Sequence, residues 1–116
     1  MGRRQTGTLA ENSAAAFLES QGFVIVARNF QRRVGEIDVV ARANDLLVVA
    51  EVRTRASDRY GGAAASITSG KQRRIAATTA LFLQQRPDLR RCRVRFDVII
   101  VRDGNVEWLK AAFDAR

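Results

Sequence analysis

Two acidic residues, Asp38 and Glu51, fall in neighbouring segments that alternate apolar and polar residues, 36–42 and 46–55. Asn44-Asp45 between these segments predicts a β-hairpin with a two-residue turn. In that register Val40 faces Val49 and Asp38 faces Glu51, with Cβ atoms about 5 Å apart. Like charges so close are destabilising, and a divalent cation would relieve the repulsion. The pair therefore predicts a metal site; the alternative is an exposed strand face on which nearby arginines pair with both acids.

The other surface of this hairpin is expected to be apolar and buried. It carries Ile37, Val39, Ala41, Val48, Ala50 and Val52. Slipping the pairing by one residue would turn this whole set towards solvent, so burial fixes the register. The same register places Glu36 opposite Arg53, on the surface that carries the two acids.

A third carboxylate, Glu11, belongs to a predicted helix over residues 8–21 that ends at Gly22. Apolar residues recur there at helical spacing: Ala10, Ala14, Phe17 and Leu18. Glu11 shares a face with Leu18, so it lies at one end of the stripe expected to pack on the sheet. Thr8 and Glu11 also have capping-box spacing, in which Glu11 would fold back onto the Thr8 amide. Both interpretations stay open.

Lys71 lies in the first turn of a second predicted helix, where the helix dipole disfavours a cation. Ser69 with Gln72 fits a capping box that opens this helix, which should end near Gln85. Its inner face carries Ile75, Thr79, Phe82 and Leu83. A phosphate group beside the helix start would offset the unfavourable position of Lys71, and a solvated lysine is the alternative.

The formal net charge of +8 is concentrated in one part of the chain. Residues 59–95 hold nine basic residues and one acid, Asp88, whereas the remaining residues balance. Such clustering indicates a phosphate-backbone partner. The excess of Arg over Lys also fits a codon bias, but a bias does not explain the clustering. With no His and only Cys92, a zinc site and His-based nucleophilic catalysis are excluded.

The remaining pattern predicts one α/β domain over residues 1–116. Residues 23–30 favour a strand, and residues 94–102 and 105–109 favour a hairpin across Asp103-Gly104. Residues 55–68 lack periodicity and are expected to form a mobile loop. The predicted order is α-β-β-β-α-β-β, a mixed central β-sheet flanked by helices.

These residues together resemble the YraN family of small bacterial proteins over residues 7–113. The resemblance is carried by Glu11, Arg28-Asn29, Gly35-Glu36-Ile37-Asp38, Glu51-Val52-Arg53, Arg55, Lys71 and Arg95-Phe96-Asp97-Val98. That family is functionally uncharacterised and resembles the restriction-endonuclease-like nucleases, especially archaeal Holliday-junction resolvases. The resemblance therefore implies a restriction-endonuclease-like fold.

The resemblance also implies roles for individual residues. Asp38 and Glu51 would be ligands of Mg²⁺ or Mn²⁺, with Glu11 as a third carboxylate and the Val52 carbonyl as a further ligand. The expected nucleic-acid-binding residues are Arg28, Arg55, Lys71, Arg73, Arg74 and Arg95. Arg53 stands where the nucleases have a lysine; it can clamp charge but cannot accept a proton. If Arg53 is a defect, Arg53→Lys should raise cleavage more than tenfold.

Three classes of function follow from the sequence. The first is a metal-dependent endonuclease in which Glu11, Asp38, Glu51 and Arg53 serve catalysis. The second is a nucleic-acid-binding module that no longer cleaves, and the third is a protein-interaction or assembly factor with an exposed apolar patch around Trp108 and Phe113. The expected partner is nucleic acid, with DNA favoured. No apolar run is long enough to span a membrane, so a cytoplasmic protein is expected; a homodimer stays open.

Overall fold

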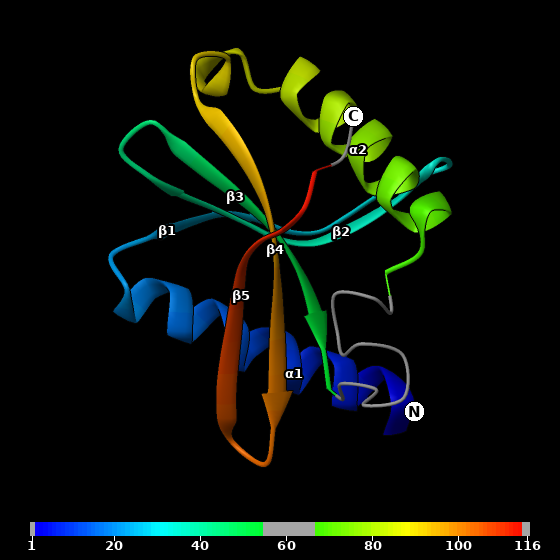
Figure 1. Ribbon diagram of the computed structural model, residues 1–116, viewed down its shortest axis with the longest axis vertical. Helices are drawn as coiled ribbons and strands as arrows, with labels where there is room; N and C mark the ends of the chain where they lie inside the picture. The colour runs from blue at the N-terminus through cyan, green and yellow to red at the C-terminus, as the bar shows by residue number, and fades with distance from the viewer. Residues whose placement is uncertain (1, 55–66, 115–116) are drawn as a thin grey trace.

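The computed structural model describes residues 2–54 and 67–114, which form an α/β domain with a five-stranded sheet and two long helices (Figure 1). In chain order the elements are α1 (Gly2–Ser20), β1 (Val24–Arg32), β2 (Gly35–Ala43), β3 (Leu46–Arg53), α2 (Ser69–Gln84), the short 3₁₀ helix η3 (Pro87–Leu89), β4 (Arg93–Arg102) and β5 (Asn105–Phe113). The predicted fold class and element order are thus confirmed.

The sheet is mixed, with strand order β1-β2-β3-β4-β5. Neighbouring strands are antiparallel except β3 and β4, which are parallel and joined through α2. Both predicted two-residue hairpins form, because Ala43 pairs with Leu46 and Arg102 with Asn105. Asn44, with a φ of 55°, adopts the left-handed conformation that such turns require.

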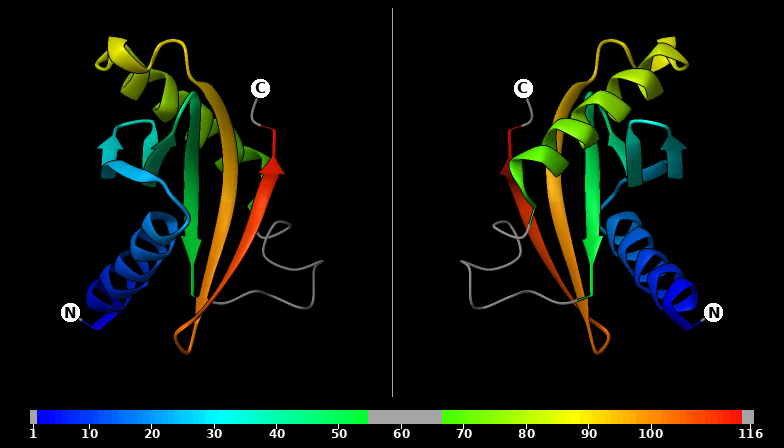
Figure 2. Two further views of the ribbon diagram at one scale, coloured as in Figure 1. Left: turned by 90° about the vertical axis from the view of Figure 1, so that its left-hand side faces the viewer. Right: turned by 90° about the vertical axis from the view of Figure 1, so that its right-hand side faces the viewer.

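Apolar layers bury both faces of the sheet, with α1 on one side and α2 on the other (Figure 2). The α1 layer consists of Ala10, Ala14, Leu18, Val39, Ala41, Val48, Ala50, Ile99 and Val101. The α2 layer includes Ile37, Val40, Leu47, Val49, Ile75, Phe82, Val98 and Ile100. The helix faces expected to pack on the sheet are the ones that do.

Alternation in β2 breaks at Asp38, which the sequence did not predict. Ile37 was expected to share a face with Val39, but it lies in the α2 layer with Val40. Pairing of β2 with β3 runs from Ala43–Leu46 to Val39–Ala50 and stops there. Across from the break, Asn29 of β1 has a φ of 53°, which turns the backbone out of the regular strand. The two strands therefore separate where Asp38 and Glu51 lie.

Both helix starts differ from their predicted positions. The first helix begins at Gly2, six residues before Thr8, because the Arg and Gln residues there are good helix formers. Thr8 is therefore internal, and the predicted Thr8–Glu11 capping box is wrong. The second helix is capped by Thr68 rather than Ser69, since the Thr68 hydroxyl accepts a hydrogen bond from the Lys71 amide at 3.1 Å.

The predicted loop at residues 55–68 falls largely outside the described residues, which resume at Ile67. Ile67 is buried, and Thr68 caps α2. No helix in the described part of the chain is long and apolar enough to cross a membrane.

Candidate metal and phosphate site

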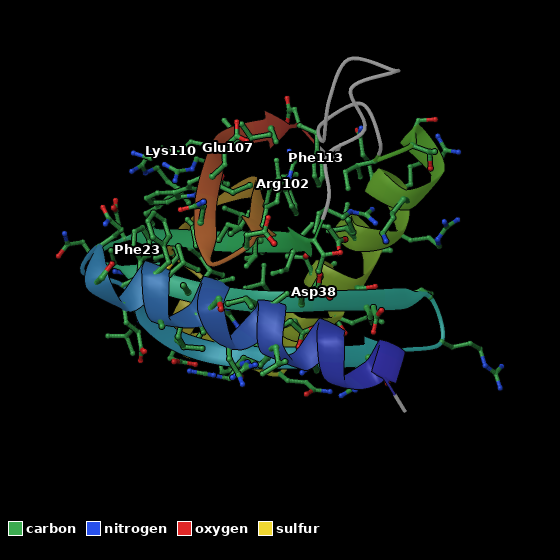
Figure 3. The ribbon with its side chains drawn as sticks, turned by 90° about the horizontal axis from the view of Figure 1, so that it is seen from below. Phe23, Asp38, Arg102, Glu107, Lys110 and Phe113 are labelled. Atoms are coloured by element: carbon green, nitrogen blue, oxygen red, sulfur yellow. The ribbon has the colours of Figure 1, made fainter. Side chains whose placement is uncertain are left out.

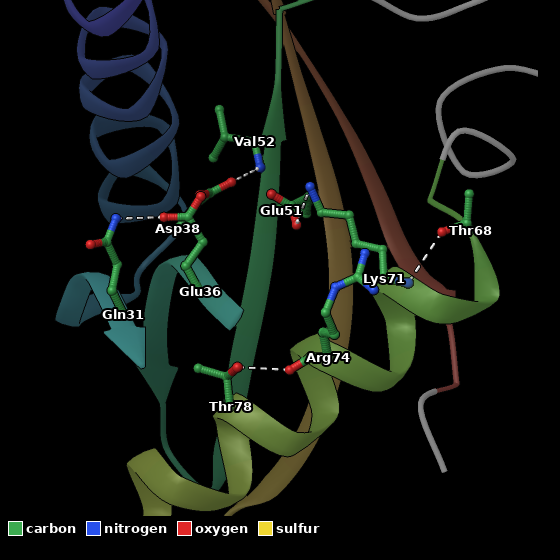
Figure 4. Close-up of polar contacts among 9 residues, drawn as sticks. All are labelled: Gln31, Glu36, Asp38, Glu51, Val52, Thr68, Lys71, Arg74 and Thr78. Atoms are coloured by element: carbon green, nitrogen blue, oxygen red, sulfur yellow. Dashed lines mark hydrogen bonds and ion pairs between the residues drawn. The ribbon is translucent and has the colours of Figure 1, made fainter. Parts of the chain in front are cut away.

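Asp38 and Glu51 lie side by side where β2 and β3 separate, and both are buried, with 8% and 7% of their surface exposed. Asp38 Oδ2 accepts a hydrogen bond from the Val52 amide at 2.8 Å (Figure 4), and Glu51 is the neighbouring acid that acts on the Asp38 carboxyl group. The Asp38 side chain thus accepts the hydrogen bond of the Val52 N–H just beyond the point where backbone pairing between β2 and β3 ends. Asp38 and Glu51 are called the carboxylate pair below.

Gly35 allows the start of β2 to pass close under α2. A Cβ atom at this position would lie 3.0 Å from Thr78 Oγ1 and 3.2 Å from Arg74 Cβ, and the φ of Gly35 is +157°. Any side chain would push β2 away from the helix. The glycine therefore positions the strand three residues before Asp38.

The protein environment disfavours the charge on Asp38. Burial, followed by the hydrogen bond and charge of Glu51, raises the pKa of Asp38 from 3.8 to about 8, against a smaller lowering by the Val52 amide. At neutral pH the carboxylate pair therefore tends to hold a proton in the absence of a cation.

Glu11 faces the same region from α1. Figure 3 shows Asp38 beside the N-terminal half of this helix. The Glu11 side chain is hydrogen-bonded to Asn29 and lies 3.9 Å from Arg28 Nη2. Burial raises the pKa of Glu11, and the Asp38 charge adds to that effect. Of the two interpretations of Glu11, the structure shows the one that turns it towards the sheet.

The donor set suits a hard divalent cation, although it is incomplete. Two buried carboxylates provide the oxygen ligands that Mg²⁺ prefers, and Val52 is held against Asp38 by its amide. Among the described residues, no three Asp, Glu, Cys or His side chains gather closely enough to hold a metal ion. Glu11 is thus near the carboxylate pair but does not complete the ligand set in this conformation.

Lys71 and Arg53, the two cationic residues predicted to lie near the carboxylate pair, are placed differently. Lys71 Nζ of α2 lies 3.7 Å from Glu51 Oε2. Arg53 of β3 has a buried Nε atom without a hydrogen-bond partner in the described part of the chain. Its predicted partner, Glu36, instead accepts a hydrogen bond from Gln31 at 2.7 Å.

The remaining predicted nucleic-acid-binding residues are in different situations. Arg73 and Arg74 are exposed on α2. Arg28 donates to Asn12 Oδ1 at 2.6 Å, and Arg95 is bound through Nε and Nη2 to Asp97. Arg55 lies outside the described residues.

In the part of the basic segment that the structure describes, residues 67–95, the basic side chains do not form one surface. With its 16 residues, α2 is about 24 Å long, so the arginines beyond its end lie away from the carboxylate pair. Two of them have acidic partners: Arg86 binds Asp88, and Arg93 lies 3.7 Å from Asp45. Only the residues at the start of α2 adjoin the site.

Sequence reasoning did not assign a role in the site to Asn29 or Gln31. Asn29 holds Glu11, and Gln31 holds Glu36. A signal for Asn29 was present, because Asn within a strand-like run is the residue that most readily tolerates a left-handed backbone.

Comparisons with a family model and with individual relatives point to the same protein family. The model of the uncharacterised protein family UPF0102 matches residues 10–101. A UPF0102 protein of Nitrosomonas europaea is 43% identical over 111 residues, covering 93% of this chain and 92% of its own length. A relative from Cupriavidus metallidurans is 48% identical over 109 residues, covering 93% of this chain and 80% of its own length. One from Paracidovorax citrulli is 46% identical over 116 residues, covering 97% and 84%.

Proposed function

Because the chain belongs to the uncharacterised family UPF0102, whose name carries no activity, we propose from the site that it is a nucleic-acid-binding protein that hydrolyses phosphodiester bonds with the help of a divalent cation. DNA is the favoured substrate class, and branched DNA is one substrate to test.

The observation that supports this proposal is the carboxylate pair. Both acids are buried, Glu51 acts on the Asp38 carboxyl group, and Asp38 accepts one hydrogen bond from a backbone N–H. A folded protein rarely keeps two adjacent buried carboxylates without compensating cations, because both desolvation and repulsion act against their charges. Lys71 compensates Glu51 in part at 3.7 Å. A bound cation would compensate both.

Each residue of the site would have a role that follows from its position. Asp38 and Glu51 would hold Mg²⁺ or Mn²⁺, with the Val52 carbonyl and Glu11 as further ligands. When bound, such an ion neutralises phosphate charge and makes water more acidic. Arg73 and Arg74 at the exposed start of α2 would bind the phosphate backbone, while Arg53 stays protonated and can only stabilise negative charge.

A binding module without cleavage is the second candidate, because Arg53 replaces the lysine of the resembling nucleases. A protein-interaction or assembly factor was expected to have an exposed apolar patch around Trp108 and Phe113. Trp108 packs edge-on against Phe17 and Phe23, and Phe113 stacks on Phe96. These aromatic residues close the core instead of forming an exposed patch. Cytoplasmic location and a homodimer stay predictions.

The test combines metal binding with cleavage. Calorimetric titration with Mg²⁺ and Mn²⁺ should show binding by the native chain, and Asp38→Asn or Glu51→Gln should abolish it. A panel of branched, duplex and single-stranded DNA and RNA should then identify a substrate cut only with metal. Asp88→Asn is the control, since Asp88 is exposed and lies in another part of the molecule. Metal binding without cleavage of any substrate would favour the binding module.

DNA binding should also depend on salt. Each phosphate contact contributes a slope of about −0.9 in log affinity against log salt concentration. Replacing Arg73 and Arg74 by Ala should flatten this slope. An unchanged slope would remove the start of α2 from the binding surface.

A further inference from the structure

We infer that Lys71, from helix α2, is the cation that binds phosphate at the carboxylate pair, where the resembling nucleases have a lysine on the strand at position 53. This inference rests on the proposed function and assigns one residue of the same site. With this assignment, arginine at position 53 no longer implies that the site lacks a lysine, because Lys71 lies at the carboxylate pair.

The geometry of Lys71 supports the assignment. Its Nζ atom lies 3.7 Å from Glu51 Oε2, and its side chain is 34% exposed whereas that of Glu51 is 7% exposed. Lys71 therefore holds its more exposed ammonium group against the Glu51 side of the carboxylate pair (Figure 4). A phosphate that approaches the pair from solvent meets this ammonium group first.

The start of α2 is held by hydrogen bonds, so the backbone of Lys71 has a fixed position. Thr68 caps the helix, and Gln72 Nε2 donates to the Ile67 carbonyl at 2.9 Å. Ile67 is 2% exposed and belongs to the α2 layer of the core. From this fixed backbone, the flexible four-carbon side chain of Lys71 can move its charge from Glu51 to a phosphate oxygen.

Arg53 is placed differently. Among residues 2–54 and 67–114, no carboxylate lies within 4 Å of its guanidinium group, and its Nε atom is buried without a hydrogen-bond partner. Although Arg53 is only two residues from Glu51, it forms no ion pair with it. Among the described residues, the cation that contacts the carboxylate pair is Lys71, through Glu51.

The role inferred for Lys71 is to bind and position phosphate. Its ammonium group would donate hydrogen bonds to a non-bridging phosphate oxygen and hold the phosphodiester against the carboxylate pair. The role requires the charge of Lys71 and no proton transfer. Arginine at position 71 should therefore preserve binding better than methionine.

The experiment compares Lys71→Met, Lys71→Arg, Arg53→Lys and the double variant Lys71→Met/Arg53→Lys. The matched control is Lys110→Met, which changes the other lysine of the chain; Lys110 lies over the ring of Trp108, 4.5 Å from its centroid. The first readout is binding of a fluorescently labelled DNA duplex in Ca²⁺ and in EDTA. The second is cleavage in Mg²⁺ or Mn²⁺ of the substrate found in the panel.

Lys71→Met should weaken Ca²⁺-dependent DNA binding about tenfold and lower cleavage about 100-fold, as expected for the loss of a charge-assisted contact to phosphate. Lys71→Arg should retain most of the binding. Arg53→Lys should restore cleavage at least tenfold in the Lys71→Met background and raise it less than tenfold alone. Lys110→Met should match the native chain. A normal thermal unfolding midpoint for Lys71→Met shows that the loss is local.

Native-like binding and cleavage by Lys71→Met would overturn the inference while leaving the nuclease function intact. So would a gain of more than tenfold from Arg53→Lys alone, which is the outcome expected if position 53 is the defect. If the native chain binds DNA but does not cut it, the Ca²⁺-dependent binding of Lys71→Met decides alone. If the native chain neither binds nor cuts, the proposed function fails and the role of Lys71 fails with it.

Discussion

Two buried aspartates of the same sheet, Asp38 and Asp97, have opposite environments. Asp97 of β4 is fully buried and accepts four hydrogen bonds, from Arg95 Nε at 2.9 Å, Arg95 Nη2 at 2.8 Å, Trp108 Nε1 at 2.7 Å and the Ala111 amide at 2.9 Å. Asp38 of β2 is 8% exposed, accepts one backbone N–H and faces a second carboxyl group. The two side chains are similarly buried, but four hydrogen-bond donors compensate the charge of Asp97 and only one backbone donor compensates that of Asp38.

The difference separates a structural carboxylate from a candidate functional one. Asp97 closes an irregularity between β4 and β5, where the register shifts between Phe96 and Val98 and Ala111 has a φ of 52°. Its negative charge is satisfied within the protein. The protein gives the charged form of Asp38 only one backbone donor, which makes Asp38 the candidate for binding a cation. The number of donors around a buried acid thus distinguishes the two roles better than burial does.

The largest expected effect is loss of stability in Asp97→Asn. The substitution removes the negative charge opposite the Arg95 guanidinium and turns an acceptor into a donor. Breaking a buried ion pair by removing one partner costs about 3–5 kcal/mol, and the value here should lie near the lower end because Arg95 is 27% exposed. Urea unfolding followed by circular dichroism would measure it.

The chain contains a matched control for this variant. Arg86 and Asp88 form the same two-point contact between residues two positions apart, at 3.0 and 2.9 Å, but at the surface. Asp88→Asn should leave the unfolding midpoint nearly unchanged. Equal losses of stability in Asp97→Asn and Asp88→Asn would show that burial does not strengthen the ion pair of Asp97. The contrast between Asp97 and Asp38 would then have no energetic basis.

A smaller loss is expected from Trp108→Phe, which removes one of the four donors to Asp97. A hydrogen bond to a charged group contributes about 1.5–3 kcal/mol, and Phe keeps an aromatic ring against Phe17 and Phe23. We expect a loss of about 2 kcal/mol, measured by circular dichroism because Trp108 is the only tryptophan. No loss would mean that the other three donors are sufficient.

Asp38→Asn should have the opposite sign. An amide can still accept from the Val52 N–H and can donate to Glu51, so it removes the repulsion without leaving an unpaired group. We expect the metal-free protein to gain about 1–2 kcal/mol of stability at neutral pH, as is common when a functional site is neutralised. The same variant should lose Mg²⁺ binding by calorimetry. A destabilised Asp38→Asn would show that its charge is already satisfied.

The sequence predicted that Asp38 and Glu51 lie close together because alternation and a two-residue turn determine the register of the hairpin up to Val39, although the alternation fails at Asp38 itself. It predicted the packing faces of both helices for the same reason, since the spacing of Ala14 and Leu18 or of Ile75 and Phe82 reflects burial directly. It also contained a signal for Asp97 that was not used. Residues two positions apart on a strand share a face, so Arg95 lies beside Asp97 and is engaged there.

The features that were missed depend on tertiary contacts. The break in alternation at Asp38 arises where β2 leaves β3, with Asn29 in a left-handed conformation across from it. The position of Lys71 at Glu51 depends on how α2 crosses the sheet. Helix starts also resisted prediction, because Thr68 and Ser69 are both good N-cap residues. None of these contacts has a local sequence period.

The pH dependence of stability tests the sign of the contrast most directly. The pKa of Asp38 is raised from 3.8 to about 8 by burial and by Glu51. Below pH 4 the group is protonated in both the folded and the unfolded state, and its contribution to stability is fully present. Between pH 4 and 8 the folded state binds more protons than the unfolded state, so the free energy of unfolding falls as pH rises, by at most about 1.4 kcal/mol per pH unit. The stability difference between Asp38→Asn and the native chain, both in EDTA, should therefore grow from pH 4 towards pH 8. Comparing the two removes the contribution of groups with shifted pKa values that do not interact with Asp38, such as Asp88. A constant difference would place Asp38 with Asp97, as a carboxylate whose charge the fold already satisfies.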